Sequence, residues 1–368
     1  MNRDEFLTSS YDFILPDELI ASYPANPRDS AKLLIYNRET KEITHTYFHQ
    51  LESFIPKDCA LIFNDTKVIK ARLFGKKQSG GKLELLLNRP LDANNINVYI
   101  RGKVKVGTEI FFDNDLVAIV KELKDDGSRV VNFYTIDSVE QLTSEALTSP
   151  ICKTHSKEKH NHCKQLRFEE LLPIIDKIGH IPLPPYIQRE DSVDDAREYQ
   201  SVFAKEEGAV AAPTASLHFT KEQHERICKD YNYAYVTLHV GSGTFKPVEV
   251  ETITDHPMHS EYYDISDKAK ELLDSDVSIL SVGTTSTRTI EFYARNNMQQ
   301  RGEANLFLHP NNKPLRVNHL LTNFHLPKST LLMLVASFVG VEKAQELYKE
   351  AIEKEYRFYS YGDAMLIL

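Results

Sequence analysis

Polar and ionisable side chains follow four apolar runs of the kind that form buried strands. They occupy residues 64–67, 239–245, 283–288 and 323–325. Amides, carboxylates, imidazoles and hydroxyls of this kind can move protons and orient a polar ligand. The apolar runs before them are 60–64, 233–240, 277–282 and 319–324.

The elements expected around these residues alternate between strands and helices. Helical patterns are expected near 206–210, 221–230, 268–273, 287–297 and 342–355. This alternation predicts an α/β fold with a mainly parallel sheet covered on both faces, a larger sandwich domain. Since the carboxyl ends of parallel strands meet at one edge, we expect the polar segments to share one crevice.

Near the carboxyl terminus the pattern is typical of an active-site edge. A short strand ends in Asn323 and His325, and Pro327 and Ser329 then open a Leu-rich helix. The chain closes with the polar aromatic segment 356–363. We therefore expect chemistry at this edge.

Two glycine- or hydroxyl-rich loops could contact a ligand. Gly241 and Gly243 would let a flat ligand approach the backbone, and Phe245 could stack on a base, although a plain tight turn is an equally good interpretation. Thr284 and Thr285 could present hydroxyls and amides to an anion, or could form an ordinary helix N-cap. Neither loop matches a P-loop or a dinucleotide fingerprint.

A second set of candidates is His218, His259 and Glu261, which lie near paired tyrosines in sequence. Histidine and carboxylate groups are suited to proton transfer, and tyrosines can form the walls of a binding site for a flat or cationic ligand. A lone histidine would more often be structural, so these roles are hypotheses.

Charge is distributed unevenly along the chain, whose net charge is −9. Residues 66–105 contain ten basic and two acidic side chains, a local charge of +8, which leaves −17 for the remainder. A basic module on an acidic body could hold a nucleic acid at one place. A solvated lysine-rich surface is the alternative.

The basic segment also has a β-rich pattern. Short apolar runs separated by Gly, Asn or Asp predict a small closed β-barrel of about six strands. We place this inserted barrel domain at residues 66–165, between the parts 1–65 and 166–368 of the larger domain. Its last part contains Cys152, His155, His160, His162 and Cys163, for which we favour a polar loop over a zinc site, and we assign no metal ligands.

Length and composition bound the class of protein. The 368 residues and 41% apolar content suit one large or two ordinary domains. No apolar stretch approaches the roughly 20 residues of a membrane span, and the N-terminus is too polar for a signal peptide. Four cysteines without a secreted-scaffold spacing favour a reducing cytoplasm. We expect a monomer because no coiled-coil pattern occurs.

Nine ordered segments resemble the S-adenosylmethionine:tRNA ribosyltransferase-isomerase family of queuosine biosynthesis. They include Ile62-Phe-Asn-Asp-Thr-Lys, Gly179-His-Ile-Pro-Leu-Pro-Pro-Tyr, Ala211-Ala-Pro-Thr-Ala-Ser-Leu-His, Val236-Thr-Leu-His-Val-Gly-Ser-Gly-Thr-Phe, Met258-His-Ser-Glu-Tyr-Tyr, Leu321-Thr-Asn-Phe-His-Leu-Pro-Lys-Ser and Tyr356-Arg-Phe-Tyr-Ser-Tyr-Gly-Asp. The resembling segments run from the first twenty residues to the last ten.

This resemblance implies a reaction and its partners. The family moves the ribosyl part of S-adenosylmethionine onto the aminomethyl group of a 7-deazaguanine at the tRNA wobble position. The product is epoxyqueuosine, and adenine and methionine are released. The implied partners are S-adenosylmethionine, which is a consumed substrate, and the tRNA anticodon arm. No metal or further cofactor and no membrane are implied.

We assign residues to this reaction as hypotheses. His218 or His259 would be the base, oriented by Glu261, and His325 or Asp65 would assist adenine departure. The predicted RNA-binding residues are Lys76, Lys77, Lys82, Arg101, Lys103 and Lys105. The predicted substrate-binding residues are Asn64, Lys67, Arg72, Thr214, His239, Gly241, Gly243, Thr244, Phe245, Thr284, Thr285, Arg288, Asn323, Lys328, Arg357, Tyr359 and Asp363.

Two alternatives remain at this point. A nucleoside hydrolase or transferase acting on small substrates would keep the crevice but leave the +8 segment without a role. A non-catalytic RNA-binding protein would leave the ionisable strand-end residues without one.

Overall fold

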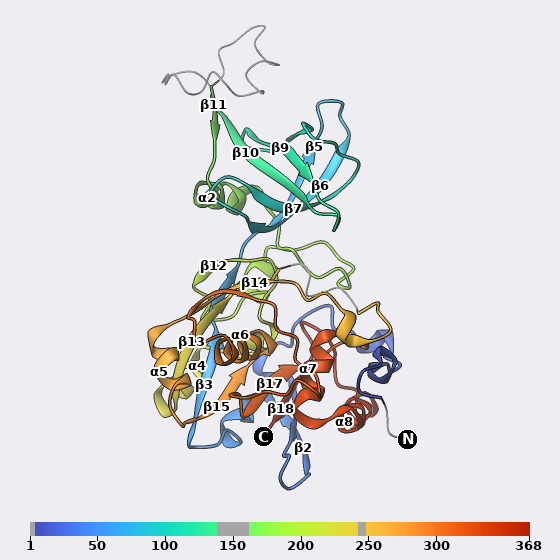
Figure 1. The fold of residues 1–368 in the computed structure, drawn as a ribbon, viewed down its shortest axis with the longest axis vertical. Helices are drawn as coiled ribbons and strands as arrows, with labels where there is room; N and C mark the ends of the chain where they lie inside the picture. Colours follow the sequence, from blue (N-terminus) through green and yellow to red (C-terminus); the bar gives the residue numbers. More distant parts are fainter. Residues whose placement is uncertain (1–3, 138–161, 242–247) are drawn as a thin grey trace. The chain divides into compact units, whose positions relative to one another are not determined.

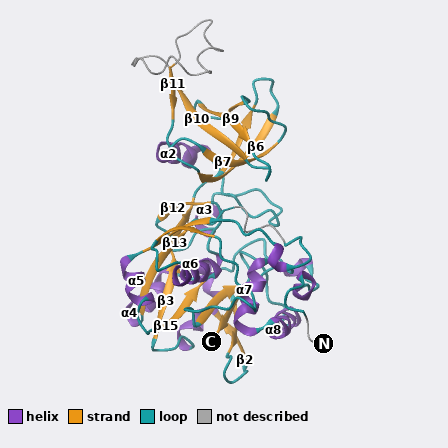
Figure 2. Cartoon of the chain, in the orientation of Figure 1, coloured by secondary structure: helices purple, strands orange, loops and turns teal. Residues whose placement is uncertain are grey.

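The chain forms two compact units in a computed structural model that describes residues 4–137, 162–241 and 248–368 (Figures 1 and 2). The larger unit contains Met1–Val68 and Leu183–Leu368, and the smaller unit is Ile69–Pro182. The smaller unit is therefore an insertion in the sequence of the larger one.

A nine-stranded sheet is the centre of the larger unit. Its four inner strands are mutually parallel and are the four buried runs expected from the sequence, which confirms the predicted fold class. Antiparallel pairs flank them on both sides. In spatial order the strands are β16 (Arg301–Ala304), β14 (Glu261–Ile265), β13 (Asn232–Leu238), β3 (Cys59–Asn64), β15 (Ser278–Val282), β17 (His319–Asn323), β18 (Ala364–Ile367), β1 (Lys32–Tyr36) and β2 (Ile43–Tyr47).

The sheet is buried on both faces, and most positions of its inner strands are apolar. Every residue of β3 is buried. Leu61 and Phe63 belong to one hydrophobic cluster, and Ala60 and Ile62 belong to another. This alternation follows from the two-residue period of a strand, whose successive side chains point to opposite faces. The two clusters thus lie on opposite sides of one strand.

Helices pack against these two clusters and against a third one that contains Leu34 and Leu320. They are α4 (Lys221–Asp230), α5 (Asp267–Leu273), α6 (Thr284–Arg295), α7 (Thr330–Val339) and α8 (Val341–Glu353) (Figure 2). The expected helix start after Pro327 is confirmed, because Ser329 Oγ accepts a hydrogen bond from Leu332 N at 3.2 Å and caps α7. Shorter elements of this unit are η1 (Thr8–Tyr11), η2 (Asp17–Leu19), η3 (Arg28–Ser30), η4 (Phe48–Ser53), α3 (Asp195–Glu198), η6 (Thr214–His218) and η8 (Ile253–Asp255).

The helix expected at residues 206–210 is wrong. Glu206–Ala209 is strand β12, which pairs in parallel with β4 (Thr66–Val68). Gly208 has φ +151°, which a helix does not allow. Long-range pairing therefore overrides the helix propensity of the two glutamates.

The smaller unit contains the expected barrel, which closes with six strands. They are β5 (Arg72–Lys76), β6 (Lys82–Pro90), β7 (Ile96–Arg101), β8 (Glu109–Phe111), β9 (Leu116–Leu123) and β10 (Arg129–Asp137). The order β10-β7-β6-β5-β8-β9 is closed by pairing of β10 with β9, and β11 (His162–Gln165) adds to β10. Leu83, Leu85 and Leu87 alternate into its core.

The boundaries of the compact insertion differ from the expected 66–165. Helix α2 (Phe168–Ile178) belongs to the barrel unit, since Phe168 N donates to Ala93 O at 2.9 Å and His180 pairs with Arg72. At the other boundary, β4 belongs to the larger unit through its pairing with β12. Both differences arise from backbone hydrogen bonds between segments that are distant in sequence.

Within the described ranges of the chain, no helix has the length and apolarity required to cross a membrane. Cys152, His155 and His160 lie outside the described residues. The alternative of a zinc site in that segment therefore stays a prediction.

Candidate active site

Asn64 connects the carboxyl ends of three of the four inner strands. Its Nδ2 donates to Leu238 O after β13 and to Thr285 Oγ1 in α6, both at 3.1 Å. Its Oδ1 accepts from Thr66 N and Leu238 N, also at 3.1 Å. All the hydrogen-bonding positions of this predicted substrate-binding amide are thus occupied by bonds that hold three strand-end segments together.

Asp65 and His239 make a second set of contacts at this edge. Asp65 Oδ1 accepts from Thr237 Oγ1 at 2.7 Å, and burial raises the pKa of this carboxyl. His239 Nδ1 is 2.8 Å from Thr66 Oγ1, and burial lowers the pKa of its ring. Asp65 holds the end of β3 against β13, and His239 holds the segment after β13 against β4. Neither lines the cavity described next.

A cavity lies at the carboxyl ends of β13, β15 and β17. Its polar lining includes five predicted substrate-binding residues and His325, while its other walls are mostly small or apolar. The lining residues are Tyr186, Ala211, Ala212, Pro213, Thr214, Ala215, Val240, Gly283, Thr284, Thr285, Thr322, Asn323, His325, Leu326, Pro327, Ser329, Leu331, Tyr359 and Ser360. Three of the four expected strand-end segments therefore share one cavity, whereas residues 64–67 do not line it.

His325 is a buried wall of this cavity. Its Nε2 lies 2.8 Å from Thr322 Oγ1, and its backbone N donates to Tyr348 Oη at 3.0 Å. Burial lowers the pKa of its ring to about 3. The imidazole is therefore neutral near pH 7.

His218 lies behind the cavity wall and contacts Asn323. The Nδ2 of Asn323 donates to His218 Nε2 at 3.0 Å. Burial, together with the positive charges of Arg357 and Arg28, lowers the pKa of His218 to about 3. Its nitrogen acts as an acceptor that orients the Asn323 amide.

Two tyrosines form an aromatic side of the cavity. The rings of Tyr186 and Tyr359 have centroids 3.8 Å apart, and Ser360 N donates to Tyr186 Oη at 3.1 Å. Tyr359 has φ +73°, a strained value for a residue with a side chain. Its N–H donates to Phe324 O at 3.0 Å, which holds this conformation.

Glu261, Arg288 and Gly241 form a separate group at β14 and α6. Glu261 Oε2 pairs with the Arg288 guanidinium, and Oε1 accepts from Gly241 N at 3.0 Å. Arg288 also reaches the carbonyl of exposed His259 at 3.4 Å. None of these four residues lines the cavity.

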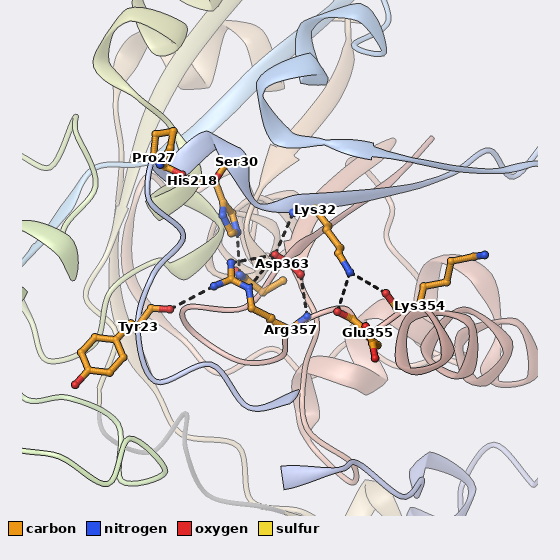
Figure 3. A network of polar contacts seen from close by, with 10 residues as sticks. Tyr23, Pro27, Ser30, Lys32, His218, Lys354, Glu355, Arg357 and Asp363 are labelled. Carbon is orange, nitrogen blue, oxygen red and sulfur yellow. Dashed lines mark hydrogen bonds and ion pairs between the residues drawn. The ribbon is translucent and has the colours of Figure 1, made fainter. Parts of the chain in front are cut away.

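Arg357 and Asp363 are connected within the protein (Figure 3). Asp363 is 1% exposed. Its carboxylate accepts hydrogen bonds from Lys32 N at 3.0 Å, from Arg357 N at 2.8 Å and from the Arg357 guanidinium at 3.1 Å. Figure 3 shows this pair beside His218, whose pKa Arg357 lowers. The pair supports the cavity from behind and does not line it.

Three other predicted substrate-binding cations are in ion pairs. Lys328 pairs with Asp12 at 2.7 Å, and Lys67 pairs with Glu207 at 2.8 Å. Arg72 lies on β5 of the barrel unit and pairs with Glu84 at 2.7 Å. Gly243, Thr244 and Phe245 lie outside the described residues.

Sequence reasoning missed most of the apolar cavity wall. Tyr186, Val240, Leu326 and Leu331 line the cavity but were not assigned to a site. Leu326 and Leu331 flank Ser329, so their place beside the predicted helix start was an available signal. Tyr186 had no such signal, because only the tertiary structure brings it to Tyr359.

Five of the six predicted RNA-binding residues lie near one another on the barrel, and no contact among the described residues places Lys105 beside them. Lys76 lies opposite Lys82 on neighbouring antiparallel strands, and Arg101 lies opposite Glu84 one step further along β6. The Lys77 Nζ donates to the carbonyl of Lys103. Five of the six side chains are exposed, Lys77 being partly buried. Since like charges opposite each other on a sheet repel, an anion beside Lys76 and Lys82 would stabilise the pairing.

The part of the chain that the structure describes has no group of three or more His, Cys, Asp or Glu side chains arranged to hold a metal ion. His162 and Cys163 begin β11, and Cys163 is buried.

Known proteins are similar to this chain over its whole length. A family model described as "Queuosine biosynthesis protein" matches residues 8–367. The S-adenosylmethionine:tRNA ribosyltransferase-isomerase of Sulfurimonas denitrificans is 73% identical over 368 residues, which is 100% of both chains. The protein of the same name from Nitratiruptor sp. is 56% identical over 365 residues, or 99% of each chain. A crystal structure of S-adenosylmethionine tRNA ribosyltransferase from Thermotoga maritima has 31% identity and a TM-score of 0.50, covering 98% of this chain and 100% of that one.

Proposed function

Because the chain belongs to the queuosine biosynthesis protein family, we propose that it is an S-adenosylmethionine-dependent tRNA ribosyltransferase-isomerase. It transfers and isomerises the ribosyl moiety of S-adenosylmethionine onto the aminomethyl group of 7-aminomethyl-7-deazaguanine at the tRNA wobble position. The products are epoxyqueuosine-tRNA, adenine and methionine.

The atoms of this reaction balance without a further reactant. The five ribosyl carbons and their three oxygens remain on the amine nitrogen as an epoxycyclopentanediol. The carbon beside the sulfonium and the amine each lose a proton, adenine leaves with a proton, and methionine leaves as a neutral thioether. One proton is released overall. The protein therefore needs a base, a neutral amine and a site that assists adenine departure.

The observation that carries the proposal is the shared cavity at the carboxyl ends of β13, β15 and β17. Ligands of open α/β sheets bind at this edge, and this one holds hydroxyl, amide and imidazole groups beside apolar walls. Full-length similarity to proteins named for this activity supports the same conclusion.

The geometry narrows the choice of base. His218 and His325 both have a pKa lowered to about 3, so each is a weak base near neutral pH. His259 is exposed, and its carbonyl accepts a hydrogen bond from Arg288, the cation that pairs with Glu261. His259, with Glu261 beside it, is therefore the base that we propose.

The residues proposed to assist adenine departure differ in position. His325 lines the cavity, where a neutral ring would hydrogen bond to the leaving base rather than act as an acid. Asp65 does not line the cavity, and its carboxyl is bound by Thr237. We therefore assign the role to His325.

The barrel supplies the proposed contact with tRNA. Its exposed side chains Lys76, Lys82, Arg101, Lys103 and Lys105 would bind backbone phosphates, which position an RNA without reading its sequence. The modified base would leave its stack to expose its amine. A monomer in the cytoplasm stays the prediction for assembly and location.

The experiment is a turnover assay with S-adenosylmethionine and tRNA carrying 7-aminomethyl-7-deazaguanine. We expect free adenine and methionine, and a tRNA whose modified base gains the mass of the epoxycyclopentanediol group in mass spectrometry. The same tRNA with guanine at the wobble position is the control. Adenine release without a gain in tRNA mass would favour a nucleoside hydrolase, and tRNA binding without adenine release would favour an RNA-binding protein.

The variants His259→Ala, His218→Ala and His325→Ala test the roles proposed for the three histidines. Full activity of all three variants would contradict these roles.

A further inference from the structure

The cavity of the larger unit is uncharged. None of its described lining residues is Asp, Glu, Lys or Arg, and His325 is neutral because burial lowers its pKa to about 3. A carboxylate, an ammonium or a sulfonium would enter this cavity without a partner of opposite charge, which is costly. The walls therefore favour an uncharged ligand.

One polar atom of the wall has no hydrogen-bond partner among the described residues. Asn323 is 1% exposed, and its Oδ1 makes no hydrogen bond to any described residue. Its Nδ2 is directed to His218, which lies outside the cavity lining. The carbonyl oxygen of a cavity-lining amide is therefore left for a ligand, and a buried acceptor of this kind is rarely left without a donor.

His218 holds this orientation of the amide. Its Nε2 accepts the Asn323 N–H at 3.0 Å, and its ring packs 4.9 Å from that of Phe48. Arg357, which the Asp363 carboxylate fixes beside it in Figure 3, disfavours protonation of the ring. An acceptor nitrogen behind Asn323 keeps the Nδ2 bound to His218 and leaves the Oδ1 of this cavity-lining side chain without a donor among the described residues.

The rest of the cavity suits a flat ring. Tyr186 and Tyr359 provide aromatic surface, and Val240, Leu326 and Leu331 provide aliphatic surface. Aromatic and apolar walls with a few polar groups that fix orientation are typical of sites for uncharged ring systems.

We propose that this cavity binds the adenine ring of S-adenosylmethionine, and that Asn323 Oδ1 selects it by accepting a hydrogen bond from the 6-amino group. The inference rests on the proposed function, because it takes S-adenosylmethionine as the substrate. Adenine is the flat uncharged part of that molecule. Its sulfonium and amino-acid end are charged, and the aminomethyl group of the tRNA base is a basic amine, so both match this cavity less well. His218 is a positioning residue for Asn323.

The first test compares two unreactive ligands on the wild-type protein by calorimetry. They are S-adenosylhomocysteine and the analogue with hydrogen in place of the 6-amino group. We expect the analogue to bind roughly 5- to 100-fold more weakly, because it leaves the buried Oδ1 without a donor. Equal binding, or tighter binding of the analogue, would overturn the inference.

The second test assigns the selectivity to Asn323. Asn323→Ala should bind the two ligands with similar affinity, and it should raise the KM for S-adenosylmethionine more than it lowers kcat. Asn318→Ala is the matched control, since Asn318 lies just before the opposite end of β17 and its Oδ1 caps Ile279 N. If Asn323→Ala does not fold, Asn323→Ser makes the same comparison with a side chain that is shorter. Retained selectivity in a folded Asn323 variant would overturn the assignment.

The third test concerns His218. His218→Gln can still accept from Asn323 through its Oε1 and should keep most of the selectivity, whereas His218→Leu should lose it. Equal loss of selectivity in both folded variants would indicate a merely structural role.

These tests also separate the two proposals. A wild-type protein that does not bind S-adenosylhomocysteine and releases no adenine refutes the proposed function and the inference with it. Turnover without discrimination between the ligands refutes the inference alone.

Discussion

The guanidinium of Arg288 and the carboxylate of Glu261 form a buried ion pair that joins helix α6 to strand β14. Their side chains are 9% and 5% exposed. Arg288 Nε also donates to Leu306 O at 3.2 Å, and Glu261 accepts from Gly241 N at 3.0 Å. The pair therefore positions the start of the loop after β13 relative to the helix whose first turn lines the cavity.

Arg288→Met should strongly destabilise the protein, because it leaves the Glu261 carboxylate buried without its cation. We expect a loss of about 3 kcal/mol in the free energy of unfolding, measured with urea. Adding Glu261→Gln should recover part of this loss, since no unpaired charge then remains. Arg226→Met, which breaks the more exposed pair with Glu52, is the control and should cost under about 1 kcal/mol. Similar losses for the two arginine variants would contradict this account.

Charge reversal on the barrel should weaken tRNA binding. Lys76→Glu with Lys82→Glu should raise the Kd for tRNA and reduce the slope of log Kd against log salt by about 1 to 2, because two phosphate contacts are lost. Lys221→Glu with Lys229→Glu, on the exposed side of α4, changes the net charge equally and is the control. A gel-shift titration at several salt concentrations makes the comparison, and equal effects of both double variants would argue against the barrel as the RNA site.

Substitutions at two glycines with the same backbone conformation can distinguish an effect of backbone strain from an effect on the cavity. Gly283 (φ +91°) begins α6 at the cavity, and Gly340 (φ +85°) begins α8. Alanine at either position should cost about 1 kcal/mol of stability from left-handed strain. A new Cβ at Gly283 would lie 3.7 Å from Ala215 and Thr285, whereas none at Gly340 meets an atom within 4 Å. Only Gly283→Ala should raise the KM for S-adenosylmethionine. A comparable rise in KM in Gly340→Ala would show that backbone strain, and not the new methyl group at the cavity, raises the KM.

Acid should destabilise the protein partly through His218. Its pKa is about 3 in the folded protein, while an unfolded histidine has a pKa of about 6.5. Between these values the unfolded chain binds more protons, so stability conferred by the neutral ring is present above pH 6.5 and decreases as pH falls towards 3. The difference in unfolding free energy between the wild type and His218→Gln should therefore shrink by about 1 kcal/mol when the pH is lowered from 6 to 5. A constant difference would contradict burial of a neutral ring.

Local sequence patterns correctly predicted the strands and helices in which the spacing of apolar residues repeats several times. The strand at 60–64 is apolar at successive positions, and Thr220 at the start of the 221–230 helix caps it through Gln223 N. Barrel strands such as β6 were also predicted, because alternate leucines enter the core. These signals are local, since each arises from the geometry of one strand or one helix.

Predictions that depended on distant partners were less complete. Glu206–Ala209 forms a strand because β4 pairs with it. Strand β14 extends the sheet from a segment that we interpreted as proton-transfer groups and aromatic walls. Glu261 was predicted to orient a base and Arg288 to bind substrate, and the structure shows that they also bind each other. Residue type indicated that these groups were important but could not indicate which partner each would meet.

The sequence by itself determined the α/β class, the inserted barrel, the family and the convergence of the strand-end segments, because periodicity and connection rules act on short stretches and restrict how parallel strands connect. Only the tertiary structure decided which strand-end groups face the cavity. Asn64 and Asp65 turn to β13, whereas Asn323 and His325 line the cavity. The physical reason is that each polar group at this crowded edge binds the nearest partner that packing supplies, and a group remains available to a ligand only where packing supplies none.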